Sequence, residues 1–273
     1  MPNKYQNPVD PEGGNLVAHD DAAAPELKET RSWFGLPEKN TPAEQFVYAK
    51  QLEKEGRITR ARKAYNALVH QWAESPEAAK AQLGVAALYE MGGNLPAAFR
   101  EYQYYVDNYA SGEEADGASF DDIIATQFSI ATTLRLKMNG GWFSSPGVDL
   151  VTSMFHHIVE NAPDWYRAPE CMMLEASAFE SEKMYQDAIP IYEKIVSRYP
   201  YSDLKIDARY RAATCRYLTS RQYPRDERTL KNALASLMNA YREKPTHEMG
   251  AVTSKRIAEL SANLTAMNFE KAE

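Results

Sequence analysis

The chain has 273 residues, 44% of them hydrophobic and 25% charged, a composition that excludes collagen, a coiled-coil rod and a wholly disordered protein. With 31 Lys and Arg against 38 Asp and Glu, the net charge is −7, which disfavours nucleic-acid binding because phosphate affinity depends on clustered basic residues. The two cysteines, Cys171 and Cys215, allow at most one disulfide; we expect two buried free thiols, with a bridge as the alternative.

The first part of the chain differs from the rest. Residues 1–40 are rich in Pro, Gly and acidic residues and show no apolar period, so we predict a flexible N-terminal tail there. Trp33 and Phe34 are the exception and are expected to dock on the folded part, a helical repeat domain over residues 41–273. No apolar run follows Met1, which fits either a cytoplasmic protein or a chain whose export signal has been removed.

Signals for helix starts and stops recur after the tail. A Ser or Thr stands before Pro at the expected first helical position, or three residues before an acidic side chain. These signals are Thr41-Pro42 with Glu44, Ser75-Pro76, Ser119 with Asp122, and Ser145-Pro146. Gly56 and Gly93 stand where the preceding helices should end.

Small residues recur at a fixed period. Ala49 and Ala86 are 37 residues apart, as are Tyr65 and Tyr102. Within each of these units a second Ala follows the first after 12 residues, and an aromatic residue follows the second Ala after 4. The unit that begins at Ala176 repeats this spacing. Paired small residues allow two helices to approach closely, so the spacing predicts helical hairpins stacked on one another.

Two units depart from this spacing. Ala131 precedes Val151 by 20 residues, and Ala212 precedes Ala233 by 21. We expect the extra residues to form insertions within residues 137–147 and 219–229. A last helix, over residues 247–269, has apolar residues at helical spacing and is expected to cap the stack.

The repeat resembles the tetratricopeptide repeat, whose signature combines small residues with Ala-x3-aromatic and a closing Pro such as Pro200. This resemblance predicts an all-α, right-handed tetratricopeptide-like solenoid of about five helical hairpins plus a C-terminal capping helix. Residues 46–90, 197–213 and 225–264 also resemble the BamD-type outer-membrane assembly lipoproteins and the exported cell-division coordinators.

The resemblance implies a function as well as a fold. It implies a non-catalytic, cofactor-free scaffold on the periplasmic face of the outer membrane, with a possible lipid anchor upstream of the given chain. It also implies a monomer or a subunit of a hetero-complex that binds a protein or peptide partner in a concave groove. A cytoplasmic location and a cell-division role are the alternatives.

The first helix of each hairpin would line that groove. Counted from the first small residue of each unit, positions −3, +1 and +4 should point inward. The candidate partner-binding residues are Phe46, Lys50, Leu83, Glu90, Phe128, Arg135, Met173, Arg209 and Arg216. The arginines toward the C-terminal end of this strip favour an extended or helical peptide of acidic character.

The sequence gives weaker signals for catalysis, metal binding and glycan binding. No phosphate-binding loop, nucleophile elbow or zinc-protease motif occurs, so we predict that the chain is not an enzyme. His156 and His157 with Glu160 are too few ligands for a metal ion, and we expect a structural role. Trp142 and Trp165 could form an aromatic platform for an envelope glycan, which is the alternative binding function.

Overall fold

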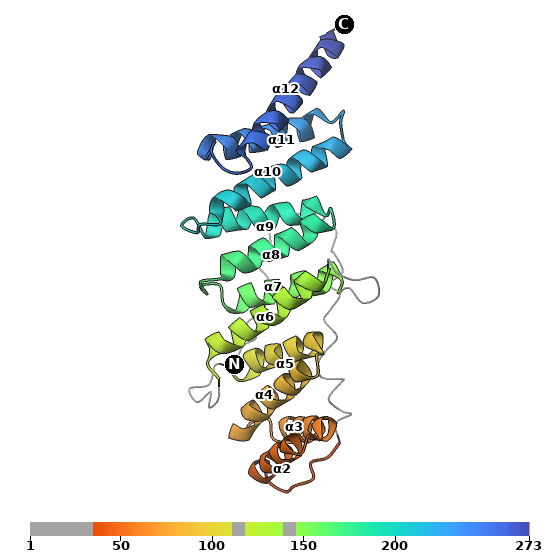
Figure 1. The fold of residues 1–273 in the computed structure, drawn as a ribbon, viewed down its shortest axis with the longest axis vertical. Helices are drawn as coiled ribbons and strands as arrows, with labels where there is room; N and C mark the ends of the chain where they lie inside the picture. The colour runs from red at the N-terminus through yellow and green to blue at the C-terminus, as the bar shows by residue number, and fades with distance from the viewer. Residues whose placement is uncertain (1–34, 111–117, 139–145, 273) are drawn as a thin grey trace, which may run out of the picture.

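The computed structural model describes residues 35–110, 118–138 and 146–272, and in this part of the chain it contains eleven α-helices and no strand (Figure 1). The helices are α2 (Pro42–Lys54), α3 (Ile58–Gln71), α4 (Pro76–Met91), α5 (Leu95–Asn108), α6 (Phe120–Met138), α7 (Val148–Asn161), α8 (Ala168–Ser181), α9 (Tyr185–Arg198), α10 (Lys205–Gln222), α11 (Glu227–Glu243) and α12 (Gly250–Ala272). They form five hairpins, here called repeats 1 to 5, and α12 follows the last. The predicted all-α, tetratricopeptide-like solenoid with a C-terminal capping helix is confirmed. Trp33 and Phe34 lie outside the described residues, and the division at residue 40 stays a prediction.

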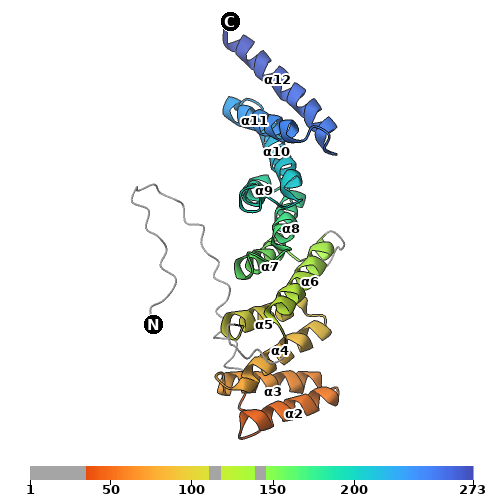
Figure 2. The same ribbon diagram turned by 90° about the vertical axis from the view of Figure 1, so that its left-hand side faces the viewer.

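The hairpins stack in chain order. Each helix packs chiefly on its sequence neighbours, and the stack runs from α2 at one end to α12 at the other (Figure 1). Figure 2 shows the first helices α4, α6, α8 and α10 along one side and the second helices α5, α7, α9 and α11 along the other. The solenoid therefore has two long surfaces. None of the described helices is long and apolar enough to cross a membrane.

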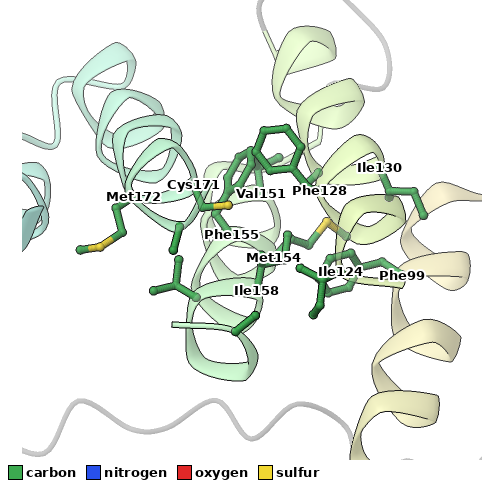
Figure 3. Packing of buried hydrophobic residues seen from close by; sticks show 14 of the residues in the cluster. Phe99, Ile124, Phe128, Ile130, Val151, Met154, Phe155, Ile158, Cys171 and Met172 are labelled. Carbon is green, nitrogen blue, oxygen red and sulfur yellow. The ribbon is translucent and has the colours of Figure 1, made fainter. Parts of the chain in front are cut away.

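Small residues sit where the helices approach most closely. Ala49, Ala86, Ala131 and Ala176 all have no exposed surface, as the repeat spacing predicts. Around them the buried side chains form three clusters: an N-terminal cluster in α2–α4, a central cluster from α4 to α10, and a C-terminal cluster in α10–α12. Figure 3 shows part of the central cluster. Burial between adjacent hairpins is thus the main source of stability.

Several predicted caps are present. The Thr41 hydroxyl accepts a hydrogen bond from the Glu44 amide at 3.3 Å, and Ser119 and Asp122 bond each other reciprocally at the start of α6. Ser75 is the N-cap of α4 and Pro76 is its first residue, as predicted, but the Ser75 hydroxyl is buried and has no hydrogen-bond partner among the described residues. Ser145 lies outside those residues.

The ends of the first helices share one backbone feature. Gly56 and Gly93 have φ angles of 71° and 74°, so they stop α2 and α4 in the left-handed conformation that the sequence predicts for them. In repeat 4 the same position is Lys183, with φ 63°. A residue with a Cβ adopts this conformation at a cost, so the end of α8 is locally strained.

The expected insertion in repeat 5 is mostly helix. α10 has 18 residues and α11 has 17, so both are longer than α8 and α9, and only residues 223–226 separate them. The extra residues expected within residues 219–229 therefore lengthen the two helices and form only a short connection between them. In repeat 3, α6 extends to Met138, and residues 139–145 of the other expected insertion lie outside the described part.

Repeat 5 is also displaced by one residue from the predicted alignment. In α4, Val85 packs toward the preceding hairpin in the N-terminal cluster, whereas Ala86 packs in the central cluster with the helices that follow. In α10, Ala212 packs in the central cluster with the preceding hairpin, and Ala213 packs with α11 and α12 in the C-terminal cluster. Ala213, and not Ala212, is therefore the counterpart of Ala86.

The capping helix begins later than predicted. Residues 244–250 form two consecutive turns, with the His247 amide bonded to the Lys244 carbonyl and the Gly250 amide bonded to the His247 carbonyl. A Cβ atom at Gly250 would lie 2.2 Å from the Pro245 oxygen, so only glycine fits at this start. α12 also contacts α10, where Thr214 accepts a hydrogen bond from Arg256 and Tyr217 donates one to Glu259.

Candidate functional site

The exposed side chains of α2, α4, α6 and α8 form the surface that we call the first-helix face. At its N-terminal end Phe46 is half-buried, with its ring centroid 5.7 Å from that of Tyr65, and the exposed Lys50 ammonium lies 5.4 Å from the Phe46 ring. Farther along, Leu83 and Met173 are half-buried and pack against the central cluster. These four predicted residues therefore each keep part of the side chain accessible on the first helices.

Glu90 has an internal partner. The Tyr102 hydroxyl donates a hydrogen bond to Glu90 at 2.9 Å, and the same bond joins Tyr65 to Glu53 at 2.8 Å and Tyr192 to Glu180 at 2.7 Å. Burial is the main reason that the pKa of each tyrosine is raised, and the neighbouring carboxylate adds to it. These bonds fix the first helix of a repeat to its second helix.

Sequence reasoning missed this role, although a signal was present. In repeats 1, 2 and 4 a Glu precedes the repeat tyrosine by 12 residues, as Glu53 precedes Tyr65. Each carboxylate accepts a hydrogen bond inside its own hairpin. Glu180 also accepts a bond from Arg211 of the next repeat at 3.3 Å. The glutamates are thus structural first, and their availability to a partner is reduced.

Repeat 3 breaks this pattern in the middle of the first-helix face. Arg135 stands where repeats 1, 2 and 4 have Glu, and Phe155 stands where they have Tyr. The Arg135 guanidinium donates hydrogen bonds to the Ser177 carbonyl at 3.0 Å and to the Ser177 hydroxyl at 3.5 Å. Its Nε is buried without a partner, as is the hydroxyl of Thr132 one turn earlier. Within the described residues no carboxylate pairs with Arg135. A cation and a hydroxyl are therefore left with unused hydrogen-bonding capacity on this surface.

Phe128 does not belong to the first-helix face, and that prediction was wrong. Only 4% of the residue is exposed. The Arg167 guanidinium lies 3.8 Å from its ring centroid, and the rings of Trp165 and Phe155 lie 5.5 and 6.2 Å away. Figure 3 shows Phe128 and Phe155 together inside the central cluster. The loop before α8 covers the side that was expected to be open.

Arg209 and Arg216 were also placed on the wrong surface, because of the one-residue displacement of repeat 5. Both line a hollow of about 520 Å³ between α9 and α11, on the side of the second helices. Arg209 forms an ion pair with Glu243, and Arg216 pairs with Glu193 at 2.5 Å. The expected basic C-terminal end of the partner strip is therefore absent from the described first-helix face.

The small Ala212 is part of the lining of that hollow. The equivalent residues of repeats 2, 3 and 4 are the larger and buried Val85, Ile130 and Glu175. In repeat 4 the Glu175 carboxylate lies 3.5 Å from His156 Nδ1, and it is the main cause of a raised pKa for that histidine. This pair stabilises the fold below the ordinary histidine pKa of about 6.5, and the contribution is lost as the pH rises through the raised value.

The histidine pair offers no metal centre in the described structure. His156 and His157 both contact Glu160, at 3.2 and 3.5 Å, and the surrounding residues include Lys194. Among the described residues no group of three or more His, Cys, Asp or Glu side chains is arranged to hold a metal ion.

Both cysteines are buried and free, as expected, so the disulfide alternative is excluded. Burial raises the pKa of Cys171 and of Cys215 to about 12. The thiols therefore stay protonated near neutral pH and behave as small apolar core residues.

One member of the predicted glycan platform is described. Trp165 is half-buried in the loop between α7 and α8, next to the exposed Tyr166. Trp142 lies outside the described residues. The two tryptophans therefore cannot be assigned to one surface.

The comparisons with known proteins agree with the repeat spacing. Residues 49–113 and residues 170–202 each match a tetratricopeptide repeat family. No curated protein sequence matches the chain.

Several solved repeat structures are similar to this one. YrrB, described as a tetratricopeptide-repeat protein with an unusual peptide-binding site, has a TM-score of 0.36 and 16% identity, over 77% of this chain and 90% of that chain. A thermophilic tetratricopeptide-repeat protein from Thermus thermophilus has a TM-score of 0.36 and 13% identity, over 81% of this chain and 100% of that chain. The TPR2AB domain of yeast Sti1, in complex with pHSP90, has a TM-score of 0.33 and 16% identity, over 83% and 86%.

Proposed function

We propose that the chain is a protein-interaction scaffold that holds a peptide segment of its partner against the first-helix face. The observation that carries this proposal is the Arg135 guanidinium in the middle of that surface, which is half-buried and has no carboxylate partner among the described residues, with the unpaired Thr132 hydroxyl one turn earlier. Leu83 and Met173 contribute accessible apolar surface on the neighbouring first helices. A carboxylate of the partner would complete the hydrogen bonding of Arg135, so the favoured ligand is a peptide with an acidic residue between apolar ones.

Peptide-library selection against the intact chain tests this proposal. Selected peptides should carry Asp or Glu, and Arg135→Ala should weaken their binding about tenfold or more, because a charge-assisted hydrogen bond contributes about 1.5–3 kcal/mol. Arg225→Ala is the matched control, since Arg225 is exposed in the α10–α11 connection and away from this surface. Circular dichroism should show that both variants are folded. Selected peptides that bind Arg135→Ala as tightly as the unchanged chain would refute the assignment.

We also propose that this scaffold works in the cell envelope, as part of an outer-membrane protein assembly complex. The support is the resemblance of residues 46–90, 197–213 and 225–264 to the BamD-type lipoproteins. A cell-division coordinating role in the same compartment is the alternative. Fractionation of cells that express the natural gene tests the location, and recovery of the protein in the cytoplasm would contradict it.

A further inference from the structure

Four of the connections from a second helix to the next first helix share one backbone geometry. In each of them two turns of three residues follow each other, and their shared residues are Ser75, Trp165, Ser202 and His247. For example, the Trp165 amide bonds the Ala162 carbonyl at 3.1 Å, and the Ala168 amide bonds the Trp165 carbonyl at 2.8 Å. Because serine serves in the same place, the turn itself does not require an aromatic residue.

The α7–α8 and α9–α10 connections border a hollow of about 690 Å³, which we call the loop pocket. Its apolar lining consists of Trp165, Tyr166, Pro169, Tyr199, Pro200, Tyr201 and Leu204. Tyr166 is 82% exposed and Tyr201 is 98% exposed. Large aromatic side chains that gather around a hollow, and remain this exposed, indicate a binding surface.

The walls of the loop pocket are held in place. The Tyr199 hydroxyl donates a hydrogen bond to the Pro163 carbonyl at 2.8 Å and so ties one connection to the other. Trp165 packs edge-on against the buried Phe128, with ring centroids 5.5 Å apart. Arg167 stacks on the other side of the same cluster and forms two hydrogen bonds to Glu170, at 2.7 and 2.9 Å. The part of the pocket that Trp165, Arg167 and Tyr199 form therefore loses little conformational entropy when it binds a ligand.

We propose that the loop pocket binds a proline-rich segment of another protein in the polyproline II conformation. Such a segment presents proline rings, which pack on aromatic faces, and backbone carbonyls that have no internal hydrogen bonds. The hydroxyls of Tyr166 and Tyr201 and the Trp165 indole form no hydrogen bond to any described residue, so they are available as donors to these carbonyls. The aromatic rings of the pocket therefore match the proline rings of the ligand, and the hydroxyl and indole donors match its carbonyls.

Charge selects among proline-rich segments. Arg167 is neutralised by Glu170, whereas Asp164 and Asp203 line the pocket without an ion pair to any described residue. Arg198 is the other cation of the lining, and its guanidinium lies 5.7 Å from the Tyr199 ring. Two available carboxylates against one cation favour a segment that carries Lys or Arg beside its prolines.

Titration calorimetry on the intact chain tests this proposal, with a synthetic peptide of ten prolines flanked by arginines. Saturable binding is expected, and Tyr201→Ala or Tyr166→Ala should each weaken it at least about tenfold, the size of effect found for aromatic anchors in interfaces. Both residues are exposed, so their removal leaves the fold intact. Tyr223→Ala is the matched control, because Tyr223 is 52% exposed and lies outside the pocket.

A second arm tests the charge argument. Asp164→Asn with Asp203→Asn should remove any preference for the arginine-flanked peptide over one flanked by glutamates. The proposal is overturned by the absence of saturable binding, or by binding that Tyr201→Ala leaves unchanged. It is also overturned if a chitin oligosaccharide, and not the peptide, binds and is lost in Tyr201→Ala, because the pocket is then a glycan site. The loop pocket is separate from Arg135, so either outcome leaves the proposed scaffold function to its own test.

Discussion

At the scale of single residues, Lys183 is the clearest departure from local preference. It has φ 63° at the position where Gly56 and Gly93 end the equivalent helices. For a residue with a Cβ the left-handed conformation costs about 1–2 kcal/mol. Replacement by glycine removes this cost, but the greater freedom of glycine in the unfolded chain offsets part of the gain in stability.

We therefore expect Lys183→Gly to stabilise the chain by about 0.5–1 kcal/mol. Urea unfolding followed by circular dichroism measures the change. Glu182→Gly is the control, since φ is −88° there and glycine brings only its entropic cost. A Lys183→Gly variant less stable than the original would show that the side chain contributes more than the backbone strain takes away.

The residue scale also shows where counting along the sequence succeeds and fails. The spacing from Ala49 to Ala86 identified the close helix contacts, because a small side chain is needed wherever two helices meet. The same count placed Phe128 on an open surface, yet Trp165 and Arg167 cover it from a loop about forty positions later. Contacts made by distant loops leave no periodic signal, so this burial could not be predicted from the first helix alone.

At the scale of helices, α10 decides how repeat 5 is aligned. Ala212 and Ala213 are adjacent, and either fits the small-residue pattern, so the sequence alone does not choose between them. The buried clusters distinguish the two alanines, because Ala213 packs with α11 and α12 whereas Ala212 borders the hollow of about 520 Å³. This one-residue difference moved Arg209 and Arg216 away from the predicted partner strip.

Substitution of the two alanines by valine distinguishes the alignments. Ala213→Val should destabilise the chain by about 1–3 kcal/mol, because extra methyl groups overpack a site with no free volume. Ala212→Val should change the stability by less than about 0.5–1 kcal/mol, since Val85 occupies the equivalent place in repeat 2. Thermal unfolding of the pair is the measurement, and a larger loss for Ala212→Val would restore the alignment that the spacing alone suggested.

At the scale of the whole molecule, stability is divided among neighbouring hairpins. The central cluster joins α4 to α10, whereas the N-terminal cluster holds only α2–α4 and the C-terminal cluster only α10–α12. α12 packs chiefly on α11, and its far end, at the exposed Phe269, extends beyond the stack (Figure 2). A stack of this kind opens from its ends, because a terminal hairpin has one neighbour and a central hairpin has two.

This arrangement was predictable in outline. The hairpins of repeats 1, 2 and 4 follow from Ala-x3-aromatic spacing, since each small residue and each aromatic has one place in the stack. The working surfaces were less predictable. The glutamates that brace the hairpins and the aromatic loop pocket depend on which side chains meet across repeats, and that is decided by the assembled fold.

Amide hydrogen exchange of the unmodified chain, resolved by peptide, tests the central claim that the protein is a stack of hairpins stabilised by their neighbours. The account predicts graded protection, with α6, α7, α8 and α9 exchanging slowest, α2 and α3 faster, and the C-terminal half of α12 fastest. One common protection level for all these helices, lost in a single step, would contradict it, because that is the behaviour of a globule with one undivided core.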